Sequence, residues 1–191
     1  MDGYFWRKAT LHSEPRSTDS CFLDNPGQDA YGRSGDVANQ RHCHTLREMS
    51  SMVKTALDSL AVPPSSRLLG WHLLDARPQE GWIRIGFDGK SEFCNPAGFL
   101  HGGFLSAMLD DTMNQAAFIK AEGKAYPSTI SMTVNFLAPA SVGPIVVEAS
   151  VSLFGKSIVF VEGRLLNSEN RLLATASANV RMIETSKALG T

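Results

Sequence analysis

Residues 100–121 are apolar on almost every side when they are placed on a helix. The residues concerned are Phe104, Leu105, Ala107, Met108, Leu109, Met113, Ala116, Ala117, Phe118, Ile119 and Ala121. A surface helix has one apolar stripe facing the core, so a helix that is apolar around most of its circumference must be covered nearly all round. Gly123 provides a residue suited to its C-terminal end. The sequence therefore predicts one central helix that the rest of the fold encloses.

Strand-like runs lie on both sides of this helix. Two precede it and four follow it, at residues 68–76, 82–87, 128–138, 145–154, 157–166 and 171–183. Short turn-like segments separate them, as expected for antiparallel neighbours. The first run after the helix alternates between an apolar set and a polar set, which predicts one dry face and one polar face. These sets are Ile130, Met132, Val134 and Phe136, and Thr129, Ser131, Thr133 and Asn135. The order of elements favours the α+β class, with an antiparallel sheet wrapped around one long central helix.

The first 45 residues are poor in branched aliphatic side chains, with only Leu11, Leu23 and Val37 among many Gly, Ser, Asp, Asn and Pro. So little apolar surface does not offset the entropy that a chain loses on ordering. We therefore predict that residues 1–45 form a disordered N-terminal extension.

The folded domain is expected to begin with an amphipathic helix. Thr45 and Glu48 have the spacing of a capping box, and apolar residues then recur on one stripe as far as Leu60, before two consecutive prolines stop the helix. We place the domain at residues 46–184 and a C-terminal tail at residues 185–191.

Composition excludes several classes of function. Lys plus Arg is 18 and Asp plus Glu is 19, a net charge of −1, so the chain lacks the basic surface of nucleic-acid binders. It contains no apolar run of about 18 residues, which argues against a membrane span. The three cysteines have no Cys-x-x-Cys spacing, and the triplet His42-Cys43-His44 has no second ligand pair nearby, so we predict no metal and no cofactor. Acidic residues near the N-terminus argue against a transit peptide and favour a cytoplasmic protein.

Residues 95–103, with the sequence NPAGFLHGG, lead directly into the central helix. Adjacent glycines lower helix propensity, so their presence at a helix start needs another cause. Backbone N–H groups at a helix N-terminus favour a developing negative charge, and the missing Cβ atoms let a ligand approach. This arrangement suits an oxyanion hole. Alternatively, Gly102 and Gly103 only allow the helix to pack closely against a sheet.

Asp110 and Asp111 lie in the middle of the apolar helix, where a carboxylate is costly unless it is paired or used. We expect one of them to face a site and the other to face a solvent gap or a partner. Gly102 and Asp110 are eight residues apart, about 12 Å along a helix, which is too far for both to act on one carbonyl carbon. A second copy with an antiparallel helix would place its Asp110 opposite Gly102 of the first. We therefore predict an obligate homodimer with shared sites.

The pattern N-x-x-G-x-x-H-G-G, with Asp eight residues after the first glycine of the final pair, resembles the hotdog-fold acyl-CoA thioesterases. The resemblance is to the phenylacetate-pathway and acyl-CoA thioesterase 13 type. It implies a hotdog fold and hydrolysis of an acyl-CoA to free acid and coenzyme A without a cofactor. It also implies a homodimer or a dimer of dimers, and a place in lipid metabolism. The first 45 residues have no counterpart in the pattern.

The same resemblance implies roles for individual residues. Gly102 would donate its backbone N–H to the thioester oxygen, while Asn95 and His101 shape and polarise that end of the site. Asp110 of the facing subunit would act as a general base on water or as a nucleophile. Thr129 stands where the family often has a serine that orients the water. The residues implied to contact coenzyme A are Ser131, Phe136, Gly155, Lys156, Ser157 and Arg181, of which the Lys and the Arg suit phosphates.

Plainer interpretations of these residues stay open. His101 would serve only as a helix cap, Asn95 only in a turn, and Thr129 only as a strand residue. Two other functions fit the same fold. One is hydration or dehydration of an acyl thioester, with His101 as the acid–base group, and the other is a non-catalytic acyl-CoA sensor. A carboxylate at position 110 argues against the sensor.

Overall fold

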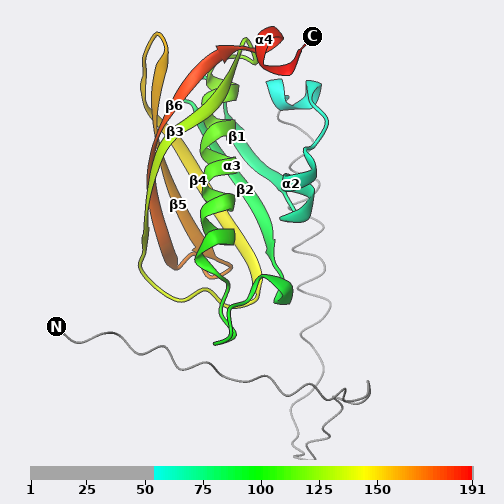
Figure 1. The fold of residues 1–191 in the computed structure, drawn as a ribbon, viewed down its shortest axis with the longest axis vertical. Coiled ribbons are helices and arrows are strands. Elements are labelled where there is room, and N and C mark those ends of the chain that lie inside the picture. Colours follow the sequence, from blue (N-terminus) through cyan, green and yellow to red (C-terminus); the bar gives the residue numbers. More distant parts are fainter. Residues whose placement is uncertain (1–53, 191) are drawn as a thin grey trace, which may run out of the picture. The chain divides into compact units, whose positions relative to one another are not determined.

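The computed structural model describes residues 54–190, in which helix α3 (Gly102–Lys120) runs along the inside of a curved antiparallel sheet (Figure 1). The sheet has six strands in the order β1-β2-β4-β5-β6-β3. Their bounds are His72–Arg77 (β1), Trp82–Gly89 (β2), Ala125–Phe136 (β3), Gly143–Phe154 (β4), Ile158–Asn167 (β5) and Leu172–Glu184 (β6). The predicted α+β architecture, a sheet wrapped around one central helix, is confirmed.

Helix α3 packs closely against the sheet because small residues face it. A Cβ atom on Gly163 of β5 would lie 3.0 Å from Sδ of Met113 and 3.1 Å from Cδ2 of Leu109, so glycine permits this approach. The helix ends as predicted, since Gly123 has a φ of 73° and its N–H donates to the carbonyl of Phe118 at 3.1 Å. Each apolar side chain fully buried in this interface contributes about 1.5–3 kcal/mol to folding.

Among residues 54–190, nothing covers one narrow face of α3. Gly103 and Ala107 are exposed, and Asp110 and Asn114 are half-buried. These residues are spaced by four, three and four positions, which places them on the same side of the helix. The sequence predicts cover on nearly all sides, and the structure departs from this only along a face of small and polar residues.

The chain before β1 differs from the prediction. Within the described residues, the expected helix to Leu60 is interrupted at Thr55, whose backbone is extended and whose side chain caps a short 3-10 helix, η2 (Ala56–Ser59). Pro64 does not stop a helix but starts one, α2 (Pro64–Leu68), because proline fits the first helical position. Leu68, expected at the start of a strand, therefore lies in α2.

The strand β3 forms one edge of the sheet and pairs only with β6. The register shifts between Thr129 and Ser131, so one extra residue is inserted at Ile130. The prediction of one dry face is wrong for Ile130 and Phe136, whose surfaces are 57% and 52% exposed. Their exposure follows from their places at a bulge and at the strand's end, on an edge that no other strand of residues 54–190 covers.

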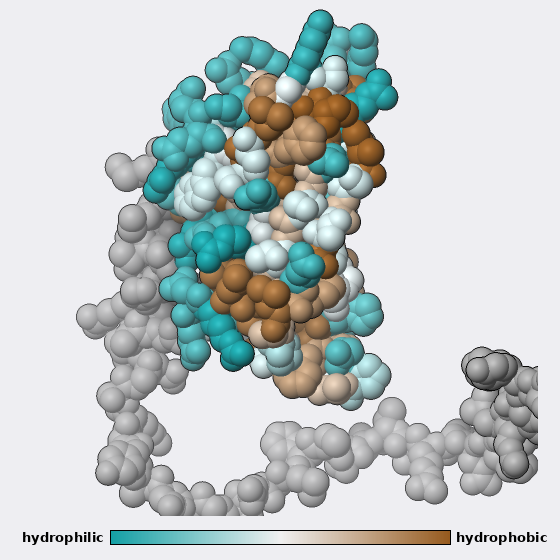
Figure 2. All heavy atoms as spheres, turned by 90° about the vertical axis from the view of Figure 1, so that its left-hand side faces the viewer, coloured by the Kyte–Doolittle hydropathy of each residue, from teal (hydrophilic) through white to brown (hydrophobic). Residues whose placement is uncertain are grey.

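A short helix, α4 (Thr185–Leu189), follows β6. The predicted extension at residues 1–45 and the first half of the predicted N-terminal helix lie outside the described residues. Within residues 54–190, no helix is both long enough and apolar enough to cross a membrane. Figure 2 views the side of the molecule that lies at the left in Figure 1, and apolar surface there is gathered in separate areas between polar ones.

Candidate active site

A tight turn brings the chain to the start of α3. The side-chain oxygen of Asn95 accepts hydrogen bonds from the N–H groups of Ala97 and Phe99 at 2.9 and 3.2 Å. Gly98 has a φ of 82°, a left-handed conformation that glycine adopts without strain. The N–H of His101 then donates to the carbonyl of Phe93 at 2.8 Å. Asn95 is therefore a turn residue in this chain, and it fixes the position of the loop that carries His101.

His101 caps α3. Its Nδ1 atom accepts a hydrogen bond from the N–H of Gly103 at 2.9 Å, so in the neutral imidazole the proton lies on Nε2. The N–H of Gly102, at the first helical position, has no hydrogen-bond partner within residues 54–190. The ring of Phe136 stands beside it, because a Cβ atom on Gly102 would lie 3.0 Å from Cζ of that ring. One backbone donor at the positive end of the helix dipole is thus left for a ligand.

The carboxylate of Asp110 is held in a three-residue network on the uncovered face of α3. The Thr129 hydroxyl donates to Oδ1 of Asp110 at 2.7 Å. The side-chain amide of Asn114 donates to the same oxygen at 3.1 Å and to Oγ1 of Thr129 at 2.9 Å. The other oxygen, Oδ2, accepts no hydrogen bond from the described part of the chain. A carboxylate fixed in this way can accept a proton from a water molecule beside it.

The structure brings Asp110 and Thr129 together and adds Asn114, which the sequence analysis does not identify. Asn114 follows Asp110 by four positions on the same helix face, and this spacing is the signal that could have identified it. Thr129 reaches Asp110 only because of the bulge in β3. Strict alternation places it on the polar face with Ser131, whereas the observed register pairs it with Val180, a fully buried residue of β6.

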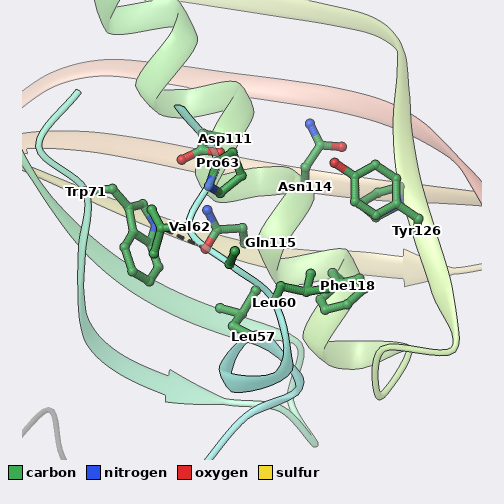
Figure 3. Close-up of a pocket in the computed structure, with 12 residues that line it drawn as sticks. Leu57, Leu60, Val62, Pro63, Trp71, Asp111, Asn114, Gln115, Phe118 and Tyr126 are labelled. Atoms are coloured by element: carbon green, nitrogen blue, oxygen red, sulfur yellow. Dashed lines mark hydrogen bonds between the residues drawn. The ribbon is translucent and has the colours of Figure 1, made fainter. Parts of the chain in front are cut away.

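Asp111 points away from this network, toward a pocket between α3 and residues 57–63 (Figure 3). Its Oδ1 accepts a hydrogen bond from the hydroxyl of Ser66 at 3.1 Å, while its Oδ2 is buried without a partner in the described residues. Burial raises the pKa of Asp111, an effect that hydrogen bonds from Gln115 and Ser66 partly oppose and the charge of Asp110 reinforces. The two adjacent aspartates thus occupy different environments.

The raised pKa of Asp111 predicts how stability depends on pH. The Asp111 carboxyl binds its proton more tightly in the folded state than in the unfolded state. The free energy of unfolding therefore falls as pH rises from the ordinary pKa of 3.8 through the raised pKa of the folded state. Asp111→Asn is therefore expected to increase stability at pH 7 by about 1 kcal/mol, the order of cost of a buried unpaired acceptor, and to change it less below pH 4. Urea unfolding at both pH values measures this difference, and a variant destabilised equally at both would contradict it.

The residues implied to contact coenzyme A lie at two ends of β3. Ser131 accepts a hydrogen bond from Asn179 at 3.1 Å, and Arg181 lies opposite Ile158, beside the hairpin at residues 155–157. This group is near the end of β3 that carries Thr129. Phe136 lies seven residues further along, about 23 Å away on an extended strand, next to Gly102. Residues 54–190 contain no cluster of three or more His, Cys, Asp or Glu side chains arranged to hold a metal ion.

Comparison with known proteins finds a family that is similar to the part of the chain around this site. Residues 97–174, from the turn before α3 into β6, match the family model described as the thioesterase superfamily. This part of the chain resembles the thioesterase superfamily, as the sequence predicts. A candidate esterase of Saccharolobus solfataricus is 29% identical to this chain over 96 residues, which are 50% of this chain and 68% of the esterase.

Solved structures agree with this resemblance. A candidate thioesterase of Ralstonia eutropha, a phenylacetic acid degradation-related protein, is 28% identical, with a TM-score of 0.62 over 72% of this chain and 98% of that chain. The PaaI protein of the E. coli phenylacetic acid degradation operon has a TM-score of 0.61 over 72% of this chain and 96% of its own, and its 18% identity supports the fold alone. The predicted resemblance to this family and its fold is confirmed, and two of the similar proteins are described as a candidate esterase and a candidate thioesterase.

Proposed function

We propose that this protein hydrolyses an acyl-CoA thioester to a free acid and coenzyme A, at two identical sites shared between two subunits. The observation that carries the proposal is the Asp110 carboxylate, which Thr129 and Asn114 hold on the uncovered face of α3. The same helix begins with the unpaired N–H of Gly102. A proton acceptor and an oxyanion donor are the two groups that acyl transfer to water requires.

The distance between the two groups supports a second subunit. Gly102 and Asp110 are separated by about 12 Å along α3, so one chain cannot place both against one carbonyl group. The Gly102 N–H and the Asp110 carboxylate each lie next to a residue of β3. Phe136 is beside Gly102, and Thr129 donates a hydrogen bond to Asp110. Antiparallel pairing of two β3 edges, with residue 129 near the partner's residue 136, would bring Asp110 to the partner's Gly102. One two-fold axis then creates both sites.

Exposed groups along this edge support the same pairing. An edge strand presents unpaired backbone groups, and proteins normally cover or charge such an edge. On β3 the exposed side chains include Ile130 and Phe136, and the adjacent face of α3 exposes Gly103 and Ala107. A second copy would cover the strand edge and the small residues of the helix together.

The chemistry follows from the positions of these groups. The thioester oxygen would accept a hydrogen bond from the partner's Gly102 N–H, while Asp110 removes a proton from water and the water oxygen bonds to the carbonyl carbon. Collapse of the tetrahedral intermediate breaks the carbon–sulfur bond, and the proton held by Asp110 passes to the leaving sulfur. Lys156 and Arg181 are both exposed at the Thr129 end of the sheet and would contact the coenzyme A phosphates.

Thiol release tests this function directly. Purified full-length protein is expected to release one free thiol for each acyl-CoA consumed, across a panel of short, long and aromatic acyl groups, with the free acid as the second product. Tight binding of intact acyl-CoA without thiol release would instead favour the acyl-CoA sensor. Loss or gain of an acyl double bond without thiol release would favour the hydratase or dehydratase.

A further inference from the structure

A pocket opens on the other side of Asn114 from Asp110. It has a volume of about 100 Å³ and lies between α3 and the segment at residues 57–63. Figure 3 shows Leu57, Leu60 and Phe118 toward one end of it, with Trp71 and Tyr126 on opposite sides. Most of the wall is apolar, as in pockets that bind small molecules.

Two buried acceptors in this wall are unpaired. Within the described residues, Oδ2 of Asp111 and Oδ1 of Asn114 have no hydrogen-bond partner. The Asn114 amide is oriented by its nitrogen, which donates to the carbonyl and carboxylate of Asp110 and to Thr129, so its oxygen must point elsewhere. Buried polar atoms are normally hydrogen-bonded, and two exceptions in one pocket need an explanation.

The hydrogen bonds that other polar groups of the pocket make leave these two atoms unpaired within the described residues. Ser66 donates to Oδ1 of Asp111, which leaves Oδ2 unpaired. The indole N–H of Trp71 donates to Oε1 of Gln115 at 3.1 Å. The Gln115 amide and the Tyr126 hydroxyl also line the pocket and can donate, but the two atoms without a partner are both acceptors, so the group that would satisfy them is a hydrogen-bond donor.

Asn114 connects this pocket to the candidate catalytic carboxylate. Its nitrogen binds Asp110 and Thr129, and its oxygen lines the pocket. Asn114 lies four residues after Asp110, about 6 Å along the helix axis. A thioester carbonyl held beside Asp110 would thus direct its acyl chain toward Asn114 and Asp111.

We propose that this pocket receives the acyl group, and that Asp111 and Asn114 select acyl groups carrying a hydroxyl within about 6 Å of the thioester carbonyl. This inference rests on the thioester hydrolysis proposed above. A cavity of about 150 Å³ holds one benzene molecule, so a pocket of about 100 Å³ suits a short acyl group. An unsubstituted acyl group would leave both acceptors unpaired on binding, which disfavours it.

Matched substrate pairs test the selection. The probes are 3-hydroxybutyryl-CoA with butyryl-CoA, and 6-hydroxyhexanoyl-CoA with hexanoyl-CoA. For at least one pair, kcat/KM of the hydroxylated member is expected to exceed that of its partner by about tenfold or more, the order expected for a hydrogen bond to a charged group. In Asp111→Leu this ratio is expected to fall close to one, because the acceptor that remains, Asn114, is uncharged. Because the ratio is taken within each variant, a general loss of activity cancels.

Controls separate recognition from folding. Ser66→Ala removes the hydrogen bond to Oδ1 of Asp111 but keeps Oδ2 in the pocket, so it should retain the preference. Asp111→Asn keeps the side-chain shape and should give a smaller preference than the native residue. Thermal unfolding of each variant shows whether it folds.

Two readouts separate this inference from the proposed function. Calorimetric Kd values for the same pairs, measured with Asp110→Asn so that the thioester stays intact, report recognition without hydrolysis. If every probe is hydrolysed but the hydroxylated substrates are not preferred, or if Asp111→Leu keeps that preference, the inference alone is overturned. Water molecules would then be the partners of both acceptors. Absence of hydrolysis, with a binding preference that Asp111→Leu removes, would overturn the proposed function and retain the donor-selective pocket.

Discussion

Replacement of Asp110 by Asn is expected to lower the rate of thioester hydrolysis by about 10²- to 10⁴-fold, the range that a general base contributes. Asn keeps the shape of the side chain and can still accept a hydrogen bond from Thr129, whose hydroxyl lies 2.7 Å from Oδ1. It cannot take a proton from water at neutral pH. The fold should persist, because position 110 is half-buried on the uncovered face of α3 rather than in the core.

The measurement is the initial rate of thiol release at saturating acyl-CoA, for variant and native protein at equal concentration. Asp88→Asn is the matched control, since it removes one carboxylate from an exposed position of β2 and should keep the native rate. Size-exclusion chromatography should give the same assembly for all three proteins. Native turnover by Asp110→Asn would remove Asp110 from the mechanism.

The central helix could be predicted from sequence because its cause is local. A helix that is apolar nearly all round has few places in a fold other than the middle, and the strand-like runs around it supply the cover. The distance between Gly102 and Asp110 along the helix could also be predicted from the sequence, because a helix rises by about 1.5 Å per residue. Both features depend only on helix geometry.

The surroundings of Asp110 could not be predicted in the same way. Thr129 faces the helix because one residue is inserted at Ile130, and a bulge of this kind reverses the alternation of every side chain before it. Nothing in the sequence of β3 alone specifies that insertion, which arises from pairing with β6. Likewise, the unpaired oxygens of Asp111 and Asn114 become apparent only when residues 57–63 are placed against α3.

A heterodimer of one Asp110→Asn subunit and one Gly102→Pro subunit is expected to recover about half of the native activity per dimer, although each variant homodimer retains only about a hundredth of that activity or less. If each site combines Asp110 of one subunit with the partner's Gly102, the heterodimer contains one site with both defects and one site with neither. If each site lies within a single chain, both sites carry one defect. The two arrangements thus predict opposite results.

Gly102→Pro is suited to this test because it removes one hydrogen-bond donor, and the contact that its added Cβ atom makes with Phe136 can be reproduced in a control variant. Position 102 is the first residue of α3, where the N–H makes no helical hydrogen bond and proline is well tolerated. His101 has a φ of −66° and a ψ of 136°, the extended conformation that proline requires in the preceding residue. Loss of one oxyanion donor is expected to reduce kcat by about 10²- to 10³-fold in the homodimer.

Gly102→Ala provides the matched control, since it adds a Cβ atom in contact with Phe136, as proline does, but keeps the N–H. Its homodimer should therefore lose far less activity than Gly102→Pro. The heterodimer is obtained by co-expression with two different affinity tags and two successive purification steps, and thiol release is compared with both homodimers prepared alike. Activity no higher than that of the homodimers would refute a shared site. Recovery would assign Asp110 and the oxyanion donor to different subunits, because subunits that are each defective can restore a site only by contributing different parts of it.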